Sequence, residues 1–203
     1  MNPLKQNPHD YLIGAERLYM RFPKVDDLLG VFAMNSDPLA MQFSPFHPWL
    51  TFNQAEQWLE RVNSRWESQK HLPMLIFARD TNQVIGNCSI GNIDATSGMA
   101  EIGYGLVRAY WGKGFMQEAL TAYMNFAFNE LGLRRIEAGT DVRNLASQKV
   151  LLKVGFVQEA LRRQCRVLKG QPIDGYIFGM LIQDWQALNC AELNYAPTQG
   201  KLE

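Results

Sequence analysis

A short loop with two glycines, placed just before a long helical pattern, is the segment whose residue types best suit ligand chemistry. Residues 106 to 119 read Leu-Val-Arg-Ala-Tyr-Trp-Gly-Lys-Gly-Phe-Met-Gln-Glu-Ala, so Gly112 and Gly114 flank Lys113. The N-terminus of a helix exposes unpaired N–H groups and carries a partial positive charge. Glycines let a ligand approach the main chain, and Lys113 adds a full charge. The segment therefore predicts a binding site for a pyrophosphate.

Two familiar phosphate-binding motifs do not fit this loop. The P-loop requires Gly-x-x-x-x-Gly-Lys-Ser/Thr, but Val107 stands where the first glycine belongs and Gly114 follows Lys113. The dinucleotide-binding motif requires Gly-x-Gly-x-x-Gly/Ala directly after a strand, and Gln117 occupies its third small position. Glu137 stands at a distance that suits a ribose-binding carboxylate, so a nicotinamide-dependent oxidoreductase stays open as an alternative.

The segment before the loop, Met99 to Leu106, predicts a strand with two unlike faces. Because side chains alternate along a strand, its even-numbered residues form an apolar face and its odd-numbered residues carry Glu101 and two glycines. Glycine inside a strand commonly marks close approach by a ligand or another backbone. We expect either a ligand along this strand or a bulge. Glu101 fits either a general base or an exposed residue paired with a cross-strand cation.

The elements that position these residues follow one order along the chain. The first half predicts strands and two helices, at residues 16–22, 26–32, 52–69, 73–79, 83–90 and 99–106. The second half predicts alternating helices and strands, at residues 112–131, 134–142, 144–154, 156–161 and 173–182. This order predicts one α/β (α+β) domain with a mixed, mostly antiparallel sheet flanked by helices. Its expected limits are 16–186, between a lead-in at 1–15 and a tail at 187–203.

Several motifs resemble the GNAT acetyltransferases. Trp111-Gly-Lys-Gly-Phe-Met116 resembles their coenzyme A pyrophosphate loop, Gln/Arg-x-x-Gly-x-Gly/Ala, with Trp and Met at its two ends. Both departures are familiar in the branch of ribosomal-protein N-terminal acetyltransferases (RimJ and RimL type). Residues 131–138 and 144–147 and the pair Gly155-Phe156 resemble that branch as well. The resemblance runs from about residue 16 to residue 185, nearly the whole chain.

The resemblance implies a GNAT-like fold that is splayed at the Met99–Leu106 strand, with acetyl-CoA wedged into the splay as cosubstrate. It implies direct attack by an amine, with backbone N–H groups near Leu106 and Val107 polarising the thioester carbonyl. No metal takes part. The implied cofactor-binding residues are Leu106, Val107, Arg108, Trp111, Gly112, Lys113, Gly114, Phe115, Met116 and Asn144.

The implied catalytic residues are Glu101, as general base, and Ser147, whose hydroxyl would meet the thioester sulfur. Many GNAT enzymes place a tyrosine seven residues after the asparagine, but here that position is Leu151. Ordinary helix capping also explains Asn144 as an N-cap, Ser147 as a helix-start residue and Gly155 as a C′ residue.

The resemblance to this branch implies the N-terminal α-amine of a protein, with a ribosomal protein as the expected acceptor. An α-amine has a pKa of about 8, so it is partly neutral near pH 7. A polyamine or antibiotic N-acetyltransferase and a non-enzymatic coenzyme A-binding module stay open as alternatives. Asp174 and Tyr176, and the aromatic segment 43–49, fit either an acceptor wall or plain packing, and we interpret His47 as a packing residue.

Composition limits the class of protein. Lys plus Arg equals Asp plus Glu at 20 each, which predicts no direct attraction to nucleic acid or to an anionic membrane. The three cysteines, Cys88, Cys165 and Cys190, are far apart and predict reduced thiols rather than a metal site. The sequence shows no secretory signal pattern and no apolar run of membrane-spanning length. We therefore expect a cytoplasmic protein, monomeric or homodimeric.

Overall fold

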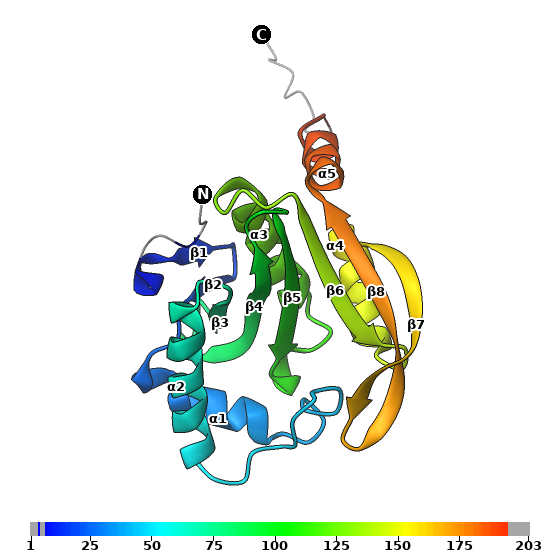
Figure 1. Cartoon of the computed structure of the whole chain (residues 1–203). Helices are drawn as coiled ribbons and strands as arrows, with labels where there is room; N and C mark the ends of the chain where they lie inside the picture. The colour runs from blue at the N-terminus through cyan, green and yellow to red at the C-terminus, as the bar shows by residue number, and fades with distance from the viewer. Residues whose placement is uncertain (1–3, 5–6, 195–203) are drawn as a thin grey trace.

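The computed structural model describes residue 4 and residues 7–194, and it forms one mixed sheet with helices on both faces (Figure 1). The sheet has eight strands in the order β1-β2-β3-β4-β5-β6-β8-β7. Every neighbouring pair is antiparallel except β5 and β6, which confirms the predicted sheet. The strands are β1 (Leu12–Gly14), β2 (Leu18–Arg21), β3 (Leu72–Ala78), β4 (Val84–Asp94), β5 (Met99–Leu106), β6 (Arg135–Asp141), β7 (Val157–Leu168) and β8 (Gln171–Leu181).

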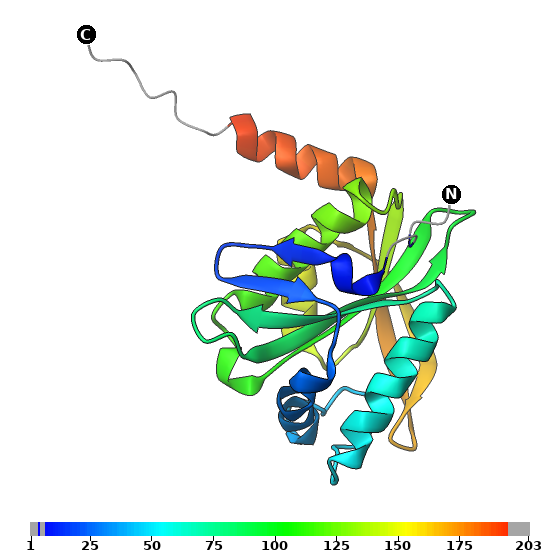
Figure 2. The same cartoon turned by 90° about the vertical axis from the view of Figure 1, so that its left-hand side faces the viewer.

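Helices cover the two faces in pairs. The pair α1 and α2 lies on one face and the pair α3 and α4 on the other, while α5 extends beyond the end of the sheet (Figure 2). Short 3-10 segments lie at Pro8–Asp10, Val25–Asp27 and Arg108–Tyr110. The α-helices are α1 (Leu28–Ser36), α2 (Asn53–Glu67), α3 (Phe115–Asn129), α4 (Leu145–Val154) and α5 (Ile182–Asn194).

The core lies on both sides of the central strands. Strand β3 is buried at every position, which explains why its sequence reads as a continuous apolar run. Tyr123 of α3 is fully buried, and its hydroxyl donates to the Leu72 carbonyl (2.6 Å) and accepts from the Ile90 N–H (3.3 Å). Both contacts tie α3 to neighbouring strands and satisfy a polar group that burial would otherwise leave unpaired.

The parallel pair β5–β6 separates soon after it begins. Pairing is limited to Met99↔Arg135, Ala100↔Ile136 and Glu101↔Glu137. Beyond this point β5 stays paired with β4 as far as Leu106, and β6 stays paired with β8 as far as Asp141. The two strands therefore diverge and leave a gap between them, as predicted for the Met99–Leu106 strand.

The two ends of the chain are more ordered than expected. The lead-in contains β1, which pairs with β2 along the edge of the sheet. The start of the expected tail is helical, because α5 continues to Asn194. Trp185 of α5 is buried, and Leu188 packs so close to Gly155 that a Cβ there would lie 2.3 Å from its Cδ1. These apolar contacts hold α5 against the domain.

Candidate active site

The loop between β5 and α3 has the backbone that a glycine-based cradle requires. Gly112 and Gly114 both take left-handed backbone conformations, with φ of 72° and 81°. Residues with a Cβ adopt this region only at a cost, so both glycines are needed for the shape of the loop. The Trp111 indole Nε1 donates to the Leu106 carbonyl (2.8 Å), which anchors the loop to the end of β5.

The N–H groups of this loop are available to a ligand. The backbone N–H groups of residues 112 to 117 find no hydrogen-bond acceptor among the residues that the structure describes. Gly114 is the N-cap of α3 and has no side chain to satisfy them. The Lys113 side chain is exposed, and its Nζ lies 5.7 Å from the ring centroid of Tyr110, just before the glycines. Unpaired donors, a helix dipole and a cation are the features that a pyrophosphate site requires, so the cradle stays a prediction that this backbone geometry permits.

The end of β5 points a donor into the gap between β5 and β6. The Val107 N–H donates to the Ile85 carbonyl of β4 (2.8 Å), so it is not free to polarise a thioester. Because successive residues of an antiparallel ladder alternate between facing their partner and facing away, Leu106 faces away from β4 and into the gap. The oxyanion prediction, first made for both residues, therefore rests on Leu106 alone.

The start of α4 contains the predicted Asn144 and Ser147. The Asn144 side chain accepts from the Ser147 N–H (3.1 Å), so its N-cap role is confirmed. The Ser147 hydroxyl lies 2.8 Å from the hydroxyl of Tyr104 on β5, and the Tyr104 hydroxyl also lies 3.3 Å from the Ser147 carbonyl. This pair joins α4 to β5 on the α3–α4 face of the sheet.

Tyr104 was missed as a polar site residue because the alternation of β5 places it on the apolar face. Burial raises the pKa of its phenol, which keeps the hydroxyl protonated, and this hydroxyl donates to the Ser147 carbonyl. Leu151 is buried in the core, as expected for an apolar residue, and offers no acid of its own. The structure thus brings two hydroxyl groups, those of Tyr104 and Ser147, together between β5 and the start of α4.

Glu101 lies on the opposite face of the sheet from Tyr104, because side chains alternate along β5. Its side chain is exposed, and no hydrogen bond or ion pair to it occurs among the described residues. Its cross-strand neighbours are Gly91 and Glu137, and the nearby cation Arg135 is paired with Glu137 (2.8 Å). The alternative of a cross-strand ion pair at Glu101 is therefore not found, which leaves its carboxylate accessible.

The two glycines on the odd-numbered face of β5 lie beside side chains of β4, so they do not leave this face bare. A Cβ on Gly103 would lie 3.5 Å from Ser89 Oγ, and one on Gly105 would lie 3.3 Å from Asn87 Oδ1. Side chains of β4 therefore lie beside both glycines. This face carries Glu101 and polar groups of β4, and it is separate from the hydroxyl pair on the other face.

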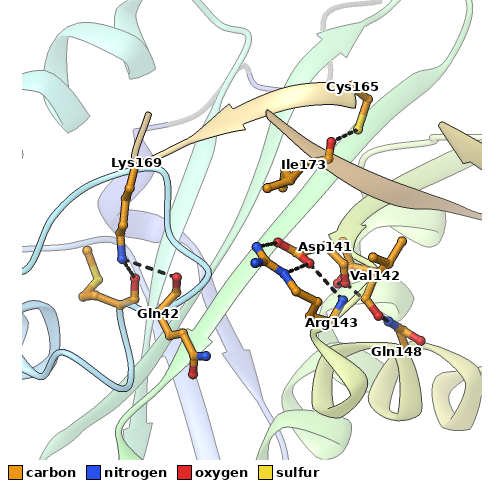
Figure 3. Close-up of polar contacts among 10 residues, drawn as sticks. Gln42, Asp141, Val142, Arg143, Gln148, Cys165, Lys169 and Ile173 are labelled. Atoms are coloured by element: carbon orange, nitrogen blue, oxygen red, sulfur yellow. Dashed lines mark hydrogen bonds and ion pairs between the residues drawn. The ribbon is translucent and has the colours of Figure 1, made fainter. Parts of the chain in front are cut away.

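A loop at residues 37–50 crosses the open end of the gap on the α1–α2 side. At one end, Asp37 forms an ion pair with Arg108 at the start of the cradle (3.0 Å). A few residues further along the loop, Lys169 Nζ at the tip of the β7–β8 hairpin donates to the carbonyls of Met41 (2.7 Å) and Gln42 (3.3 Å) (Figure 3). Side chains far apart in the sequence thus hold the 37–50 loop from two sides.

A buried carboxylate lies at the end of β6, beside the gap. Asp141 is only 3% exposed, and Arg143 donates to it from Nε (2.9 Å), Nη2 (2.6 Å) and the backbone N–H (2.8 Å) (Figure 3). These hydrogen bonds, with a further contribution from Arg166, lower the pKa of Asp141. Asp141 is therefore a poor base, and it holds the exposed guanidinium of Arg143 in place.

Other residues singled out in the sequence have structural roles. Asp174 accepts from the Gln164 N–H (2.8 Å) and so stabilises the irregular part of the β7–β8 hairpin. Trp49 is buried and packs against Trp58, with ring centroids 6.5 Å apart. His47 is exposed, so the interpretation of a packing residue is wrong, because the loop turns its side chain outward.

Metal ligands, membrane-spanning helices and cysteines are the remaining features that bear on the class of protein. Among the described residues, no group of three or more His, Cys, Asp or Glu side chains could hold a metal ion. In the same part of the chain, no helix is both long and apolar enough to cross a membrane. Cys88 and Cys165 are free thiols, and the side chain of Cys190 lies outside the described part.

The known sequences that this chain resembles are N-acetyltransferases. A model described as "Acetyltransferase (GNAT) domain" matches residues 17–157. The uncharacterized N-acetyltransferase p20 of Bacillus licheniformis is 34% identical over 171 residues, covering 84% of this chain and 96% of its own. The [Ribosomal protein uS5]-alanine N-acetyltransferase of Escherichia coli is 29% identical over 111 residues, covering 54% of this chain and 57% of its own.

Comparison with solved structures shows the same fold. A putative ribosomal-protein-serine acetyltransferase from Vibrio cholerae has a TM-score of 0.73 and 27% identity, covering 86% of this chain and 99% of its own. A spermidine N-acetyltransferase from Vibrio cholerae, solved with CoA and spermine, has a TM-score of 0.74 and 19% identity, covering 84% and 98%. With a family match over most of the chain and a splayed sheet beside an anion cradle, the chain belongs to the acetyltransferase (GNAT) family and is an acetyl-CoA-dependent acyltransferase.

Proposed function

We propose that this protein transfers the acetyl group of acetyl-CoA to the N-terminal α-amine of a protein, with a ribosomal protein as the favoured acceptor. The observation that carries the proposal is the gap between β5 and β6. It has unpaired amides of residues 112 to 117 at its mouth and a Leu106 N–H directed into it. Hydroxyl groups lie on one face of β5 and an accessible carboxylate on the other.

In this proposal, residues on the two faces of β5 take different steps of the acetyl transfer. The amine nitrogen attacks the thioester carbonyl, so a C–N bond forms and the C–S bond breaks. In this proposal Glu101 takes the proton that the amine loses, directly or through water, and Leu106 N–H stabilises the oxyanion. Ser147, with its hydroxyl hydrogen-bonded to Tyr104, donates a proton to the departing sulfur and takes one back from water, while Glu101 releases its proton to water. The products are the N-acetylated acceptor and coenzyme A.

The charges near the acceptor side support a peptide over a polyamine. A polyamine carries several positive charges and needs free carboxylates to bind it. Here Asp141 is paired with Arg143 and Asp37 with Arg108. Glu101, which is unpaired among the described residues, is thus a single free carboxylate rather than the several that a polyamine needs. Arg166 adds another positive charge within electrostatic reach of Asp141. One relative is a ribosomal-protein acetyltransferase and one structural neighbour acts on spermidine, so electrostatics is what favours the first for this chain.

The test is acetylation by the purified protein of three acceptor classes with acetyl-CoA: peptides with free N-termini, spermidine and an aminoglycoside. We expect mass spectrometry to find the acetyl group on peptide α-amines, with N-terminally blocked peptides that contain lysine as the matched control. Acetylation of spermidine or the aminoglycoside alone would overturn the acceptor. Binding of acetyl-CoA without turnover on any amine would favour a non-enzymatic module, and binding of NADH alone would favour an oxidoreductase.

We propose the cytoplasm as the place of action, supported by two free thiols at Cys88 and Cys165. Acetyl-CoA and newly made protein N-termini are both present there. Comparison of ribosomal-protein N-termini from cells with and without the gene tests location and acceptor together. Identical N-terminal acetylation in both would contradict the ribosomal acceptor.

A further inference from the structure

An arginine in the turn between β1 and β2 contacts the cradle, although 96 residues separate it from Lys113 in the sequence. The Arg17 backbone N–H and its Nε donate to the two carboxylate oxygens of Glu118, each at 2.6 Å. Its Nη1 donates to the Lys113 carbonyl (3.0 Å). Its guanidinium carbon lies 4.4 Å from the ring centroid of Phe115, in a cation–π contact. One side chain thus contacts the loop and the first turn of α3.

The turn that carries Arg17 is itself well fixed. The Arg79 N–H donates to the Arg17 carbonyl (2.9 Å), and the Arg79 Nε donates to the Ala15 carbonyl (2.8 Å). Ala15 N–H donates to the Leu18 carbonyl (2.9 Å) across the turn. These hydrogen bonds fix the β1–β2 turn, so the Arg17 guanidinium contacts the cradle from a well-held part of the sheet.

The contact with Lys113 determines where the next amide points. A trans peptide unit is planar, so its carbonyl and its N–H point in opposite directions. Because Arg17 holds the Lys113 carbonyl, the Gly114 N–H is directed away from Arg17, and it is one of the unpaired amides of the cradle. Glycine tolerates both signs of φ, so without this contact the Lys113–Gly114 peptide could turn over at little cost.

The contact with Glu118 has an electrostatic consequence. Glu118 lies in the first turn of α3, where its negative charge would repel a bound diphosphate. Its carboxylate is bound on both oxygens by Arg17, and its side chain is 17% exposed. Arg17 therefore neutralises the one acidic side chain in the first turn of this helix while it orients a cradle amide.

We propose that Arg17 is a positioning residue for the diphosphate of acetyl-CoA, acting through the Lys113–Gly114 peptide and through Glu118. The inference rests on the proposed function, because it needs a coenzyme A thioester in the cradle. Arg17 does not touch the reacting atoms. It affects affinity for donors that carry the diphosphate and leaves the chemical step alone.

The test compares Arg17→Ala, Arg17→Lys and Glu118→Gln with the matched control Arg61→Ala, an exposed arginine on α2. Calorimetry gives the Kd for coenzyme A, and steady-state rates give kcat and KM. If the oriented cradle is populated only about a tenth of the time without Arg17, the Kd and KM rise about tenfold while kcat changes less than threefold. Arg17→Lys keeps the charge but not the forked contact, so it shows most of the loss.

S-acetylpantetheine, which lacks the diphosphate, separates positioning from general stability. We expect Arg17→Ala and wild type to use this donor equally well, at equal kcat/KM. An unchanged Kd for coenzyme A in Arg17→Ala and Arg17→Lys overturns the inference, as does an equal loss with both donors. If the wild-type protein binds no coenzyme A, the proposed function fails together with this inference. If the wild-type protein binds coenzyme A and the Arg17 variants bind it equally well, this inference alone fails.

Discussion

The two sides of the gap between β5 and β6 are built in different ways. The cofactor side is built mainly from one continuous segment, in which a strand, a glycine loop and a helix follow one another from Met99 to Asn129, and Arg17 braces this segment from the β1–β2 turn. The acceptor side joins the 37–50 loop to Arg108 and to Lys169, so its contacts link residues that are far apart in the sequence. A local motif thus supplies most of the proposed cofactor side, whereas the acceptor surface depends on tertiary contacts throughout. The predictions below test this contrast.

The largest effect is expected in the cradle. Gly114→Val places a β-branched residue at a φ of 81° and puts side-chain atoms beside Arg17 and the loop amides. We expect affinity for acetyl-CoA to fall more than about a hundredfold, a loss of roughly 3 kcal/mol. Calorimetry of the folded variant measures this.

The matched control is Gly132→Val, at the other end of α3. Gly132 has a similar φ of 65°, and a Cβ there meets nothing within 4 Å. It should lose stability through the same backbone strain and keep its affinity for acetyl-CoA. Equal loss of affinity in both variants would show that strain, rather than the cradle, explains the effect.

The next effect concerns the hydroxyl pair. Ser147→Ala should lower kcat about 10- to 100-fold, by removing a donor to the departing sulfur. Tyr104→Phe should lower kcat by a smaller factor, because it acts through Ser147. The double variant should be no slower than Ser147→Ala alone, since residues that act as a unit are not additive. Additive losses, or normal rates in both single variants, would show that the pair only supports α4.

Glu101→Gln should produce a pH-dependent loss. The acceptor α-amine is mostly protonated below its pKa of about 8, so removal of a base matters most at low pH. We expect kcat to fall about tenfold at pH 6.5 and to approach the wild-type value near pH 9. Glu130→Gln, an exposed glutamate at the end of α3, is the control. A loss that is the same at every pH would assign Glu101 a role other than base.

The contrast between the two sides also explains what the sequence could predict. The limits of the Met99–Leu106 strand and the cap at Asn144 depend on neighbouring residues, and both are confirmed. Strand β1 was missed, because so short an edge strand has no periodicity and forms only by pairing with β2. The helix α5 was read as a tail, since its apolar contact with Gly155 is tertiary.

Residues of the candidate site also divide into those that the local sequence predicts and those that only tertiary contacts reveal. The glycines of the cradle were predictable, because a loop before a helix exposes its amides whatever the rest of the fold. Arg17 and Lys169 carried no signal, since a lone cation in a turn looks like any solvated residue. Val107 shows the reverse case, because a ladder hydrogen bond to Ile85 removes the donor that the motif suggested. Only the three-dimensional pairing of strands could decide this.

The smallest effect is expected at the acceptor loop. Lys169→Ala removes the contacts to the Met41 and Gln42 carbonyls, so the 37–50 loop loses its support from the β7–β8 hairpin. The lost hydrogen bonds of a charged group correspond to about 1 kcal/mol or slightly more in loop ordering, or a three- to tenfold rise in the acceptor KM. The KM for acetyl-CoA should stay unchanged, because the cradle keeps all of its own contacts. Lys153→Ala, an exposed lysine at the end of α4, is the control. A rise in the KM for acetyl-CoA that equals the rise for the acceptor would mean that the two sides of the gap are coupled, and the division between a local cofactor side and a tertiary acceptor side would no longer hold.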